Sequence, residues 1–322
     1  MLLDIIVTHY NESWDVCKKG FDMLALQRCV DFNDFKITLY HDGTEPFPEE
    51  CFAGYPYQVE QITIDHRGIA GVRNYAIAHS EGTWIKFNDC DDMFASIYSV
   101  RQILDALHES DAFDVLWFPF YFEYLDGRRF LLDDIHPVFT HNKLFRREFL
   151  VEKNIWFNEK LTWCEDSAFL ALLEMEIDIN RRGKIKAESP IYCYAVRMGS
   201  LCNRPEIKFA NRESFFERHK YVAEEFRKHG HIDQYNTMVV RVMCDSFLTL
   251  DRMKFDEDTS ELERRVWEYF RDHKQQFLDC TAENFDLVIE ACNRERDGCE
   301  PITKDEFLKW LRQLQDKHKG VE

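Results

Sequence analysis

The first 120 residues of this 322-residue chain alternate strand-like apolar runs with stretches that have helical spacing. Such alternation predicts βαβ units and a largely parallel sheet. The predicted strands are Leu2 to Thr8, Phe35 to His41, Gln58 to Ile64, Trp84 to Asn88 and Val115 to Phe122. The predicted helices between them are Trp14 to Cys29 and Gly68 to His79. This layout is typical of nucleotide-binding α/β proteins, whose ligands bind beyond the carboxyl ends of the strands.

The sequence changes in character from about Glu206, where amphipathic helices follow one another to the end of the chain. Ser260 with Glu263 and Thr303 with Glu306 both fit a capping box at a helix start. We therefore expect an α/β domain over residues 1–204 and an α-helical domain over residues 205–322. The helical part has no motif that we can attach to chemistry. Capping the sheet, shaping an acceptor cleft and self-association all stay open for it, as does the oligomeric state.

Composition limits the location and the partners of the chain. Acidic residues outnumber basic ones by 59 to 41, and the formal net charge of -18 does not favour nucleic acid as a partner. The opening MLLDIIVTHY lacks a basic region and predicts a first strand, and no apolar stretch approaches the roughly 20 residues of a transmembrane segment. The 11 cysteines are scattered without metal-ligand spacing, which favours reduced thiols in a cytoplasmic protein.

Aspartates follow the apolar strand that begins at Trp84. Asp89 and Asp91 are two residues apart, so on an extended chain they point to the same side. The two carboxylates repel each other, and a hard divalent cation removes that repulsion and can bridge a nucleotide diphosphate. The alternative is an acidic turn in solvent, with no ligand.

Four segments resemble motifs of glycosyltransferase family 2, the large inverting family with the GT-A fold. The segments are Val7-Thr-His-Tyr-Asn-Glu12, His41-Asp-Gly-Thr44, Gly68-Ile-Ala-Gly-Val-Arg-Asn74 and Phe87-Asn-Asp-Cys-Asp-Asp92. They stand in the family's order and cover, with later matches, roughly residues 1–204. The resemblance implies a GT-A nucleotide-diphospho-sugar transferase fold, which is a Rossmann-like mixed α/β sheet flanked by helices, here with a C-terminal helical domain.

The resemblance also implies roles for individual residues. A divalent metal, Mn²⁺ or Mg²⁺, would be held by Asp91 and Asp89. The implied contacts with the nucleotide-sugar donor are Thr8, Tyr10, Asn11, Asp42, Arg73, Asp89 and Arg197. His41 departs from the family pattern, which more often has a second aspartate at this position.

The segment from Ile155 to Asp166 resembles the family's stretch that ends in an ED pair at a helix start. The resemblance makes Asp166 the implied catalytic base and Glu165 its neighbour in the donor or metal shell. A helix N-terminus would favour the ionised form of Asp166. The alternative is that both carboxylates serve only as partners of the helix dipole. The segments His141 to Glu148 and Tyr194 to Ser200 are also similar to the family.

The resemblance therefore implies a metal-dependent inverting glycosyltransferase that acts on an acceptor hydroxyl. By the habit of the family, UDP is the expected nucleotide and a hexose the expected sugar. The acceptor is left open among saccharide, protein, metabolite and modified base. One rival is a nucleotidyltransferase, which usually has a glycine-rich loop after its first strand, whereas Thr8 to Ser13 has no glycine. The other is an inactive glycosyltransferase-like scaffold, which would have lost a carboxylate, but Asp89, Asp91, Glu165 and Asp166 are all present.

Overall fold

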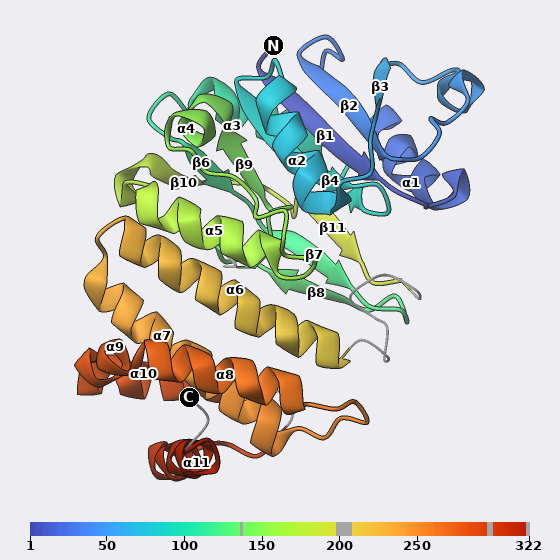
Figure 1. Cartoon of the computed structure of the whole chain (residues 1–322). Helices are drawn as coiled ribbons and strands as arrows, with labels where there is room; N and C mark the ends of the chain where they lie inside the picture. Colours follow the sequence, from blue (N-terminus) through green and yellow to red (C-terminus); the bar gives the residue numbers. More distant parts are fainter. Residues whose placement is uncertain (136–137, 198–207, 295–298, 320–322) are drawn as a thin grey trace. The chain divides into compact units, whose positions relative to one another are not determined.

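The computed structural model describes residues 1–135, 138–197, 208–294 and 299–319. The chain forms two compact units, Met1–Arg204 and Pro205–Glu322, and the boundary expected near residue 204 lies outside the described residues. Figure 1 shows the strands in the first unit and helices alone in the second. None of the helices in these described ranges is both long enough and apolar enough to cross a membrane.

The first unit is built on a seven-stranded mixed sheet with the order β10-β6-β9-β4-β1-β2-β3. The strands β3, β2, β1 and β4 are parallel neighbours, as the alternating sequence predicts, and β9 runs antiparallel between β4 and β6. Their bounds are β1 Leu3–His9, β2 Phe35–Asp42, β3 Val59–Ile64, β4 Trp84–Asp89, β6 Val115–Trp117, β9 Lys143–Arg146 and β10 Arg182–Lys184. A second sheet has the order β5-β11-β7-β8, with β5 Met93–Phe94, β11 Tyr192–Ala195, β7 Phe120–Glu123 and β8 Arg129–Leu132.

Helices pack against the large sheet, and its central strands are buried along nearly their whole length. All seven residues of β1 are buried. The helix α2 packs against β1 and β2, and Figure 1 shows it crossing these strands. The helices of this unit are α1 Trp14–Ala25, α2 Gly68–His79, α3 Ser99–His108, α4 Arg147–Glu152 and α5 Glu165–Glu176, with short 3₁₀ turns at Glu49–Phe52 and Ile179–Arg181.

The second unit is arranged around α7, which contacts α6 and α8 to α11. Its helices are α6 Lys208–Lys228, α7 Ile232–Phe247, α8 Ser260–Asp272, α9 Lys274–Asp279, α10 Ala282–Arg294 and α11 Lys304–Lys317, and a π-helical turn spans Leu248–Arg252. Inside this core, the Asp245 carboxylate accepts a hydrogen bond of 2.7 Å from Arg241 and lies 3.0 Å from His219 Nδ1. Because a buried ion pair fixes the register of helices more than it stabilises them, we read this group as structural.

Three local details differ from the sequence-based expectations. The run from Val115 to Phe122 is two strands in different sheets, because Pro119 between them has no N–H to donate to a ladder. The first helix ends at Ala25 and not at Cys29. The helix α8 starts at Ser260, whose N–H and hydroxyl donate to Asp258, so the expected capping box at Ser260 is wrong.

The second expected capping box is confirmed at Thr303. The Thr303 hydroxyl accepts a hydrogen bond from the Glu306 N–H, and the Glu306 carboxylate accepts one from the Thr303 N–H. This reciprocal pair satisfies two N–H groups that the first turn of α11 would otherwise leave without partners.

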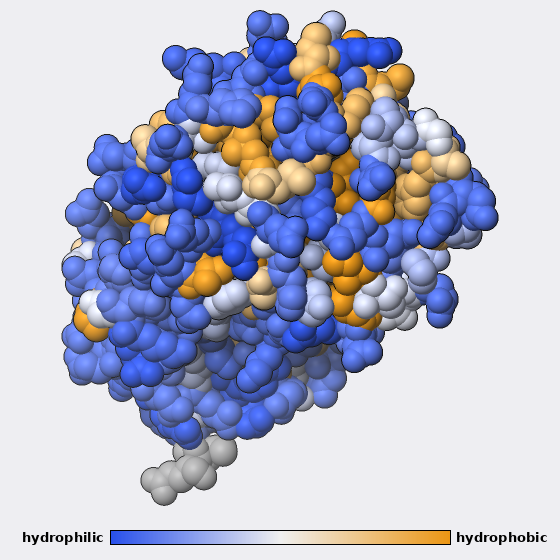
Figure 2. Space-filling model, turned by 90° about the horizontal axis from the view of Figure 1, so that it is seen from above, coloured by the Kyte–Doolittle hydropathy of each residue, from blue (hydrophilic) through white to orange (hydrophobic). Residues whose placement is uncertain are grey.

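One face of the surface is largely hydrophilic (Figure 2). Figure 2 shows one face on which hydrophilic residues surround several separate groups of hydrophobic ones. Scattered apolar residues of this kind are normal on a folded protein and do not by themselves mark a binding face.

Candidate active site

The candidate site lies where β1, β2 and β4 end. The strand register sets Thr8 beside both Tyr40 and Asp89, and His9 beside His41. The Thr8 hydroxyl donates to Asp89 Oδ1 at 3.4 Å. Three motifs that are far apart in sequence therefore meet at one edge of the sheet, which is the edge where ligands bind in α/β sheets of this type.

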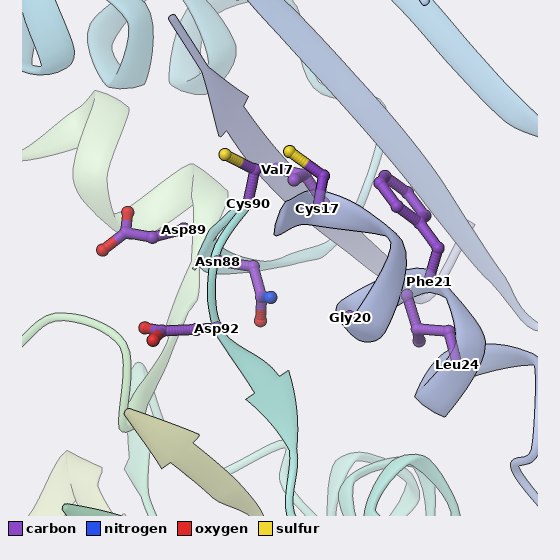
Figure 3. A pocket seen from close by; sticks show the side chains of 9 residues that line it. All are labelled: Val7, Cys17, Gly20, Phe21, Leu24, Asn88, Asp89, Cys90 and Asp92. Atoms are coloured by element: carbon purple, nitrogen blue, oxygen red, sulfur yellow. The ribbon is translucent and has the colours of Figure 1, made fainter. Parts of the chain in front are cut away.

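The loop after β4 directs its side chains to two sides. In Figure 3 the carboxylates of Asp89 and Asp92 point to one side, and the Cys17 sulfur of α1 points toward Cys90. A cavity of about 10 Å³ between α1 and this loop has room for no more than one water molecule, so it is not a nucleotide pocket. Gly20 makes this packing possible, because a Cβ there would lie 2.6 Å from the Asp92 carbonyl oxygen.

Arg73 holds three carboxylates of the site together. From α2, its guanidinium donates to Asp89 at 3.1 Å, to Glu165 at 3.3 Å and to Asp166. The aromatic rings of Phe87 and Phe157 lie 5.8 and 5.4 Å from the guanidinium carbon, close enough for cation–π contact with the buried arginine. The predicted base and the first aspartate of the β4 loop are thus joined through one buried cation.

The charges of this cluster do not balance, since three carboxylates share one guanidinium. Burial, followed by repulsion from Asp166, raises the pKa of Glu165 to about 8. Burial also raises the pKa of Asp166, and the attraction of Arg73 and the hydrogen bond from Thr140 at 2.9 Å only partly oppose this shift. The expectation that the start of α5 keeps Asp166 readily ionised is therefore wrong in direction, because burial outweighs the helix end.

Arg197 makes a second cluster, with Asp91 and Glu12. Its guanidinium donates to Asp91 and, at 2.9 Å, to Glu12. Burial and then repulsion from Asp89 raise the pKa of Asp91. Burial also raises the pKa of Glu12, but hydrogen bonds, first that from the Tyr10 N–H at 3.1 Å, outweigh it and lower the pKa overall.

The turn after β2 organises the start of α2. The Asp42 carboxylate accepts hydrogen bonds from the N–H groups of Arg67 at 2.7 Å and Gly68 at 3.0 Å, and it lies 2.9 Å from His66. Gly43 has a φ of +71° and sits so close to His66 that a side chain there would clash. Asp42 therefore shapes the turn that carries His66.

Tyr10 and Asn11 are exposed in the turn after β1. The Tyr10 ring stacks on the His66 ring with centroids 4.7 Å apart, and 47% of Tyr10 is exposed. An exposed aromatic pair at the edge of this site is a surface on which a flat base can stack.

Sequence reasoning missed three residues that the structure brings into the site. Glu12 is the last residue of the first matched motif, and its place in that motif is the signal by which the sequence could have revealed it. Lys86 is fully buried in the apolar run of β4, where burial lowers its pKa to about 7, and it donates to Asn88 at 2.7 Å. Thr140 holds Asp166, and nothing in its local sequence marks that role.

The aspartates suit a divalent cation in their chemistry. In the described part of the chain, no three His, Cys, Asp or Glu side chains form a ready metal site. A cation that also binds a diphosphate needs only one or two protein carboxylates, and Asp91 has a raised pKa that a cation would reverse. Asp91 and Asp89 therefore fit such a group, provided that the cation takes the place of the Arg197 guanidinium at Asp91.

Comparison with solved structures identifies the fold. The chain overlays a structure of S. aureus TarS 1-349 with a TM-score of 0.62 at 17% identity, covering 92% of each chain. It overlays S. aureus TarS with a TM-score of 0.61, covering 92% of this chain and 53% of that one. This likeness, together with the mixed sheet and its flanking helices, defines a GT-A fold, as the sequence predicts.

The sequence also resembles known proteins. Residues 4–159 match the model of Glycosyl transferase family 2. The chain is also 27% identical over 193 residues to the Uncharacterized glycosyltransferase EpsJ of Bacillus subtilis (strain 168), covering 52% of this chain and 54% of that protein, so it spans about half the length of this relative. The N-terminal unit is therefore similar to glycosyltransferase family 2 over residues 4–159.

Proposed function

We propose that this chain is an inverting glycosyltransferase that moves a sugar from a UDP-sugar to an acceptor hydroxyl. The observation that carries the proposal is the Arg73 cluster, which sets the proposed base Asp166 next to Asp89 at the ligand-binding edge of the sheet. The family match supports transfer from a nucleotide-sugar. Support for UDP comes from TarS 1-349 in complex with UDP-GlcNAc, whose structure overlays this chain with a TM-score of 0.52 at 16% identity, covering 91% of this chain and 80% of that one.

Asp166 would remove the proton of the acceptor hydroxyl as the oxygen attacks the anomeric carbon from the face opposite the diphosphate. With a pKa of about 8, Glu165 carries a proton at neutral pH. With Glu165 protonated, Asp89 and Asp166 are the two anions that share Arg73. No third negative charge then opposes the ionised form of Asp166. The two oxygens of Asp166 accept from Arg73 and Thr140, and a carboxylate oxygen has a second lone pair with which it would accept the proton of the acceptor hydroxyl.

On the donor side, Tyr10 and Asn11 would contact the base, with Asp42 and Thr8 supporting the strand ends around it. Asp91 and Asp89 would hold Mn²⁺ or Mg²⁺, which supplies positive charge against the leaving diphosphate. Arg197, once it leaves Asp91, is the exchangeable guanidinium of the site and would bind the diphosphate. We further propose that the reaction takes place in the cytoplasm, because the described cysteines are free thiols.

The experiment that tests this proposal is incubation with UDP-glucose, UDP-galactose or UDP-GlcNAc and Mn²⁺, with UDP release and the anomeric configuration of the sugar product followed by NMR. We expect one donor to be turned over with inversion and Asp166→Asn to be inactive. Turnover with retention, or equal turnover by the variant, would exclude Asp166 as the base of an inverting transfer. Lack of turnover of any donor, combined with lack of UDP binding, would remove the proposed function.

A further inference from the structure

Two buried histidines meet at the ends of β1 and β2. His9 Nδ1 and His41 Nδ1 lie 2.9 Å apart, and the exposed fractions of the two residues are 6% and 0%. The other ring nitrogens are also engaged. His9 Nε2 lies 2.8 Å from the Glu12 carbonyl oxygen, and His41 Nε2 lies 2.9 Å from Gln61 Oε1.

These contacts fix the number of protons on the pair. The Glu12 carbonyl only accepts, so His9 Nε2 must donate to it. The Gln61 amide is held in one orientation, because its oxygen accepts from the Phe47 N–H and its nitrogen donates to the Phe47 carbonyl, each at 3.0 Å. His41 Nε2 must therefore also donate.

The contact between the two Nδ1 atoms then needs a third proton. Two neutral imidazoles carry two protons in total, and the outer contacts use both of them. Without a further proton, two nitrogen lone pairs would face each other at 2.9 Å. A hydrogen from the Thr44 hydroxyl, 3.3 Å from His9 Nδ1, would satisfy one lone pair and leave the other facing it. The observed geometry is that of a pair with three protons and one positive charge.

The two rings differ in burial, and this difference indicates which one donates. His41 is fully buried and burial lowers its pKa to about 4, so His41 is the neutral acceptor and the less buried His9 is the donor of the shared proton. In the described part of the chain, the groups against the rings are neutral: Gln61 from β3, and Thr44 and Phe47 from the loop after β2. Glu12 contacts His9 through its backbone, and its carboxylate binds Tyr10, Cys90 and Arg197 rather than an imidazole.

The pair supports the turn that carries the proposed donor contacts. His9 holds the Glu12 carbonyl, and Glu12 in turn holds the Tyr10 N–H and the Arg197 guanidinium. We propose that His9 and His41 are positioning residues that share one extra proton, hold the Tyr10–Glu12 turn in place and make donor binding weaken as pH rises. The link to the donor rests on the proposed function, whereas the proton on the pair does not.

The proton itself can be observed by NMR of protein labelled with ¹⁵N-histidine, across about pH 6 to 9. At the low end we expect one ring with the shifts of an imidazolium and one neutral ring, with a coupling that joins their Nδ1 atoms. The backbone amides of Tyr10 and Glu12 should shift with the same midpoint as the imidazolium. Two neutral rings throughout this range, or a titration that leaves these amides unmoved, would overturn the proposal.

A binding experiment tests the consequence for the donor. We expect UDP affinity of the wild-type protein to fall by about tenfold from about pH 6 to 9, the equivalent of one lost hydrogen bond. In His9→Gln, an amide with two N–H bonds can donate to both Glu12 and His41 without an extra proton, so this fall should disappear. The matched control His79→Gln removes an exposed histidine of α2 and should keep the wild-type profile.

These experiments distinguish a failure of the positioning role from a failure of the proposed function. An unchanged pH profile in His9→Gln, beside a wild-type protein that binds UDP, would overturn the positioning role and leave the proposed function intact. Lack of UDP binding at every pH would overturn the proposed function and the link to the donor, while the NMR titration would still decide the shared proton.

Discussion

The site contains two arginine clusters that differ in how firmly they are built. Arg73 is 5% exposed and holds Asp89, Glu165 and Asp166, whereas Arg197 is 33% exposed and holds Asp91 and Glu12. A buried ion pair cannot lose one partner without leaving a desolvated charge, but a partly exposed pair exchanges its partner with solvent or ligand at little cost. The difference assigns Arg73 to the framework of the proposed base and Arg197 to the exchangeable side of the site.

The largest expected effect is on the rate of sugar transfer, and it comes from changing the proposed base in the Arg73 cluster. Asp166→Asn should lower the rate of sugar transfer by at least about a thousandfold, because the acceptor hydroxyl loses its proton acceptor. UDP binding, measured by calorimetry, should stay within a fewfold of wild type. Asp105→Asn on α3, an exposed carboxylate outside the site, is the control and should transfer normally. Transfer by Asp166→Asn at the control's rate would leave the Arg73 cluster with a structural role only.

The next effect is on stability. Arg73→Met should cost about 3–5 kcal/mol, because three partly buried carboxylates lose the buried cation that they share. Thermal and denaturant unfolding of the full chain would measure this loss. Arg101→Met removes an exposed pair on one helix turn and should change stability by no more than about 0.5 kcal/mol. If Arg73→Met lost no more stability than the control, the Arg73 cluster would exchange its partners as easily as the Arg197 cluster.

Arg197→Met tests the other side of the comparison. We expect a change in stability below about 1 kcal/mol, because the pair is partly exposed. UDP affinity should fall by about tenfold, since the diphosphate loses one charged hydrogen-bond donor. Binding titrations beside unfolding curves would separate the two effects. A large loss of stability with unchanged UDP affinity would reverse the roles that we assign to the two arginines.

The last prediction concerns the proton on Glu165 and the dependence of stability on pH. Its carboxyl holds a proton up to about pH 8 in the folded state but releases it near 4.5 when unfolded, so folding stability contributed by this group falls as pH rises between these values. Glu165→Gln should therefore flatten the decline of melting temperature over this range. Glu109→Gln, at an exposed position after α3, should leave the decline as it is. Parallel declines in both variants would mean that Glu165 is ionised in the fold.

The sequence predicted the parallel strands and the edge where the motifs meet because apolar runs and strand-end polar residues are local signals. It did not reveal the Arg73 cluster, whose partners Glu165 and Asp166 stand 92 and 93 residues further along the chain. It also did not reveal that burial would raise the pKa of Asp166, because desolvation depends on the whole fold around a group and not on its helix position. Lys86 shows the same limit, since a lysine within an apolar strand gives no local sign of its partners.

The most direct test of the central claim is calorimetric titration with UDP, with and without Mn²⁺, on the wild-type protein and on Asp91→Asn, with GDP, CDP and TDP as comparisons. The account predicts that UDP binds the wild-type protein, that Mn²⁺ strengthens this binding, and that Asp91→Asn loses the effect of the metal. Absence of binding by every nucleotide, or identical metal-independent binding by both proteins, would contradict it.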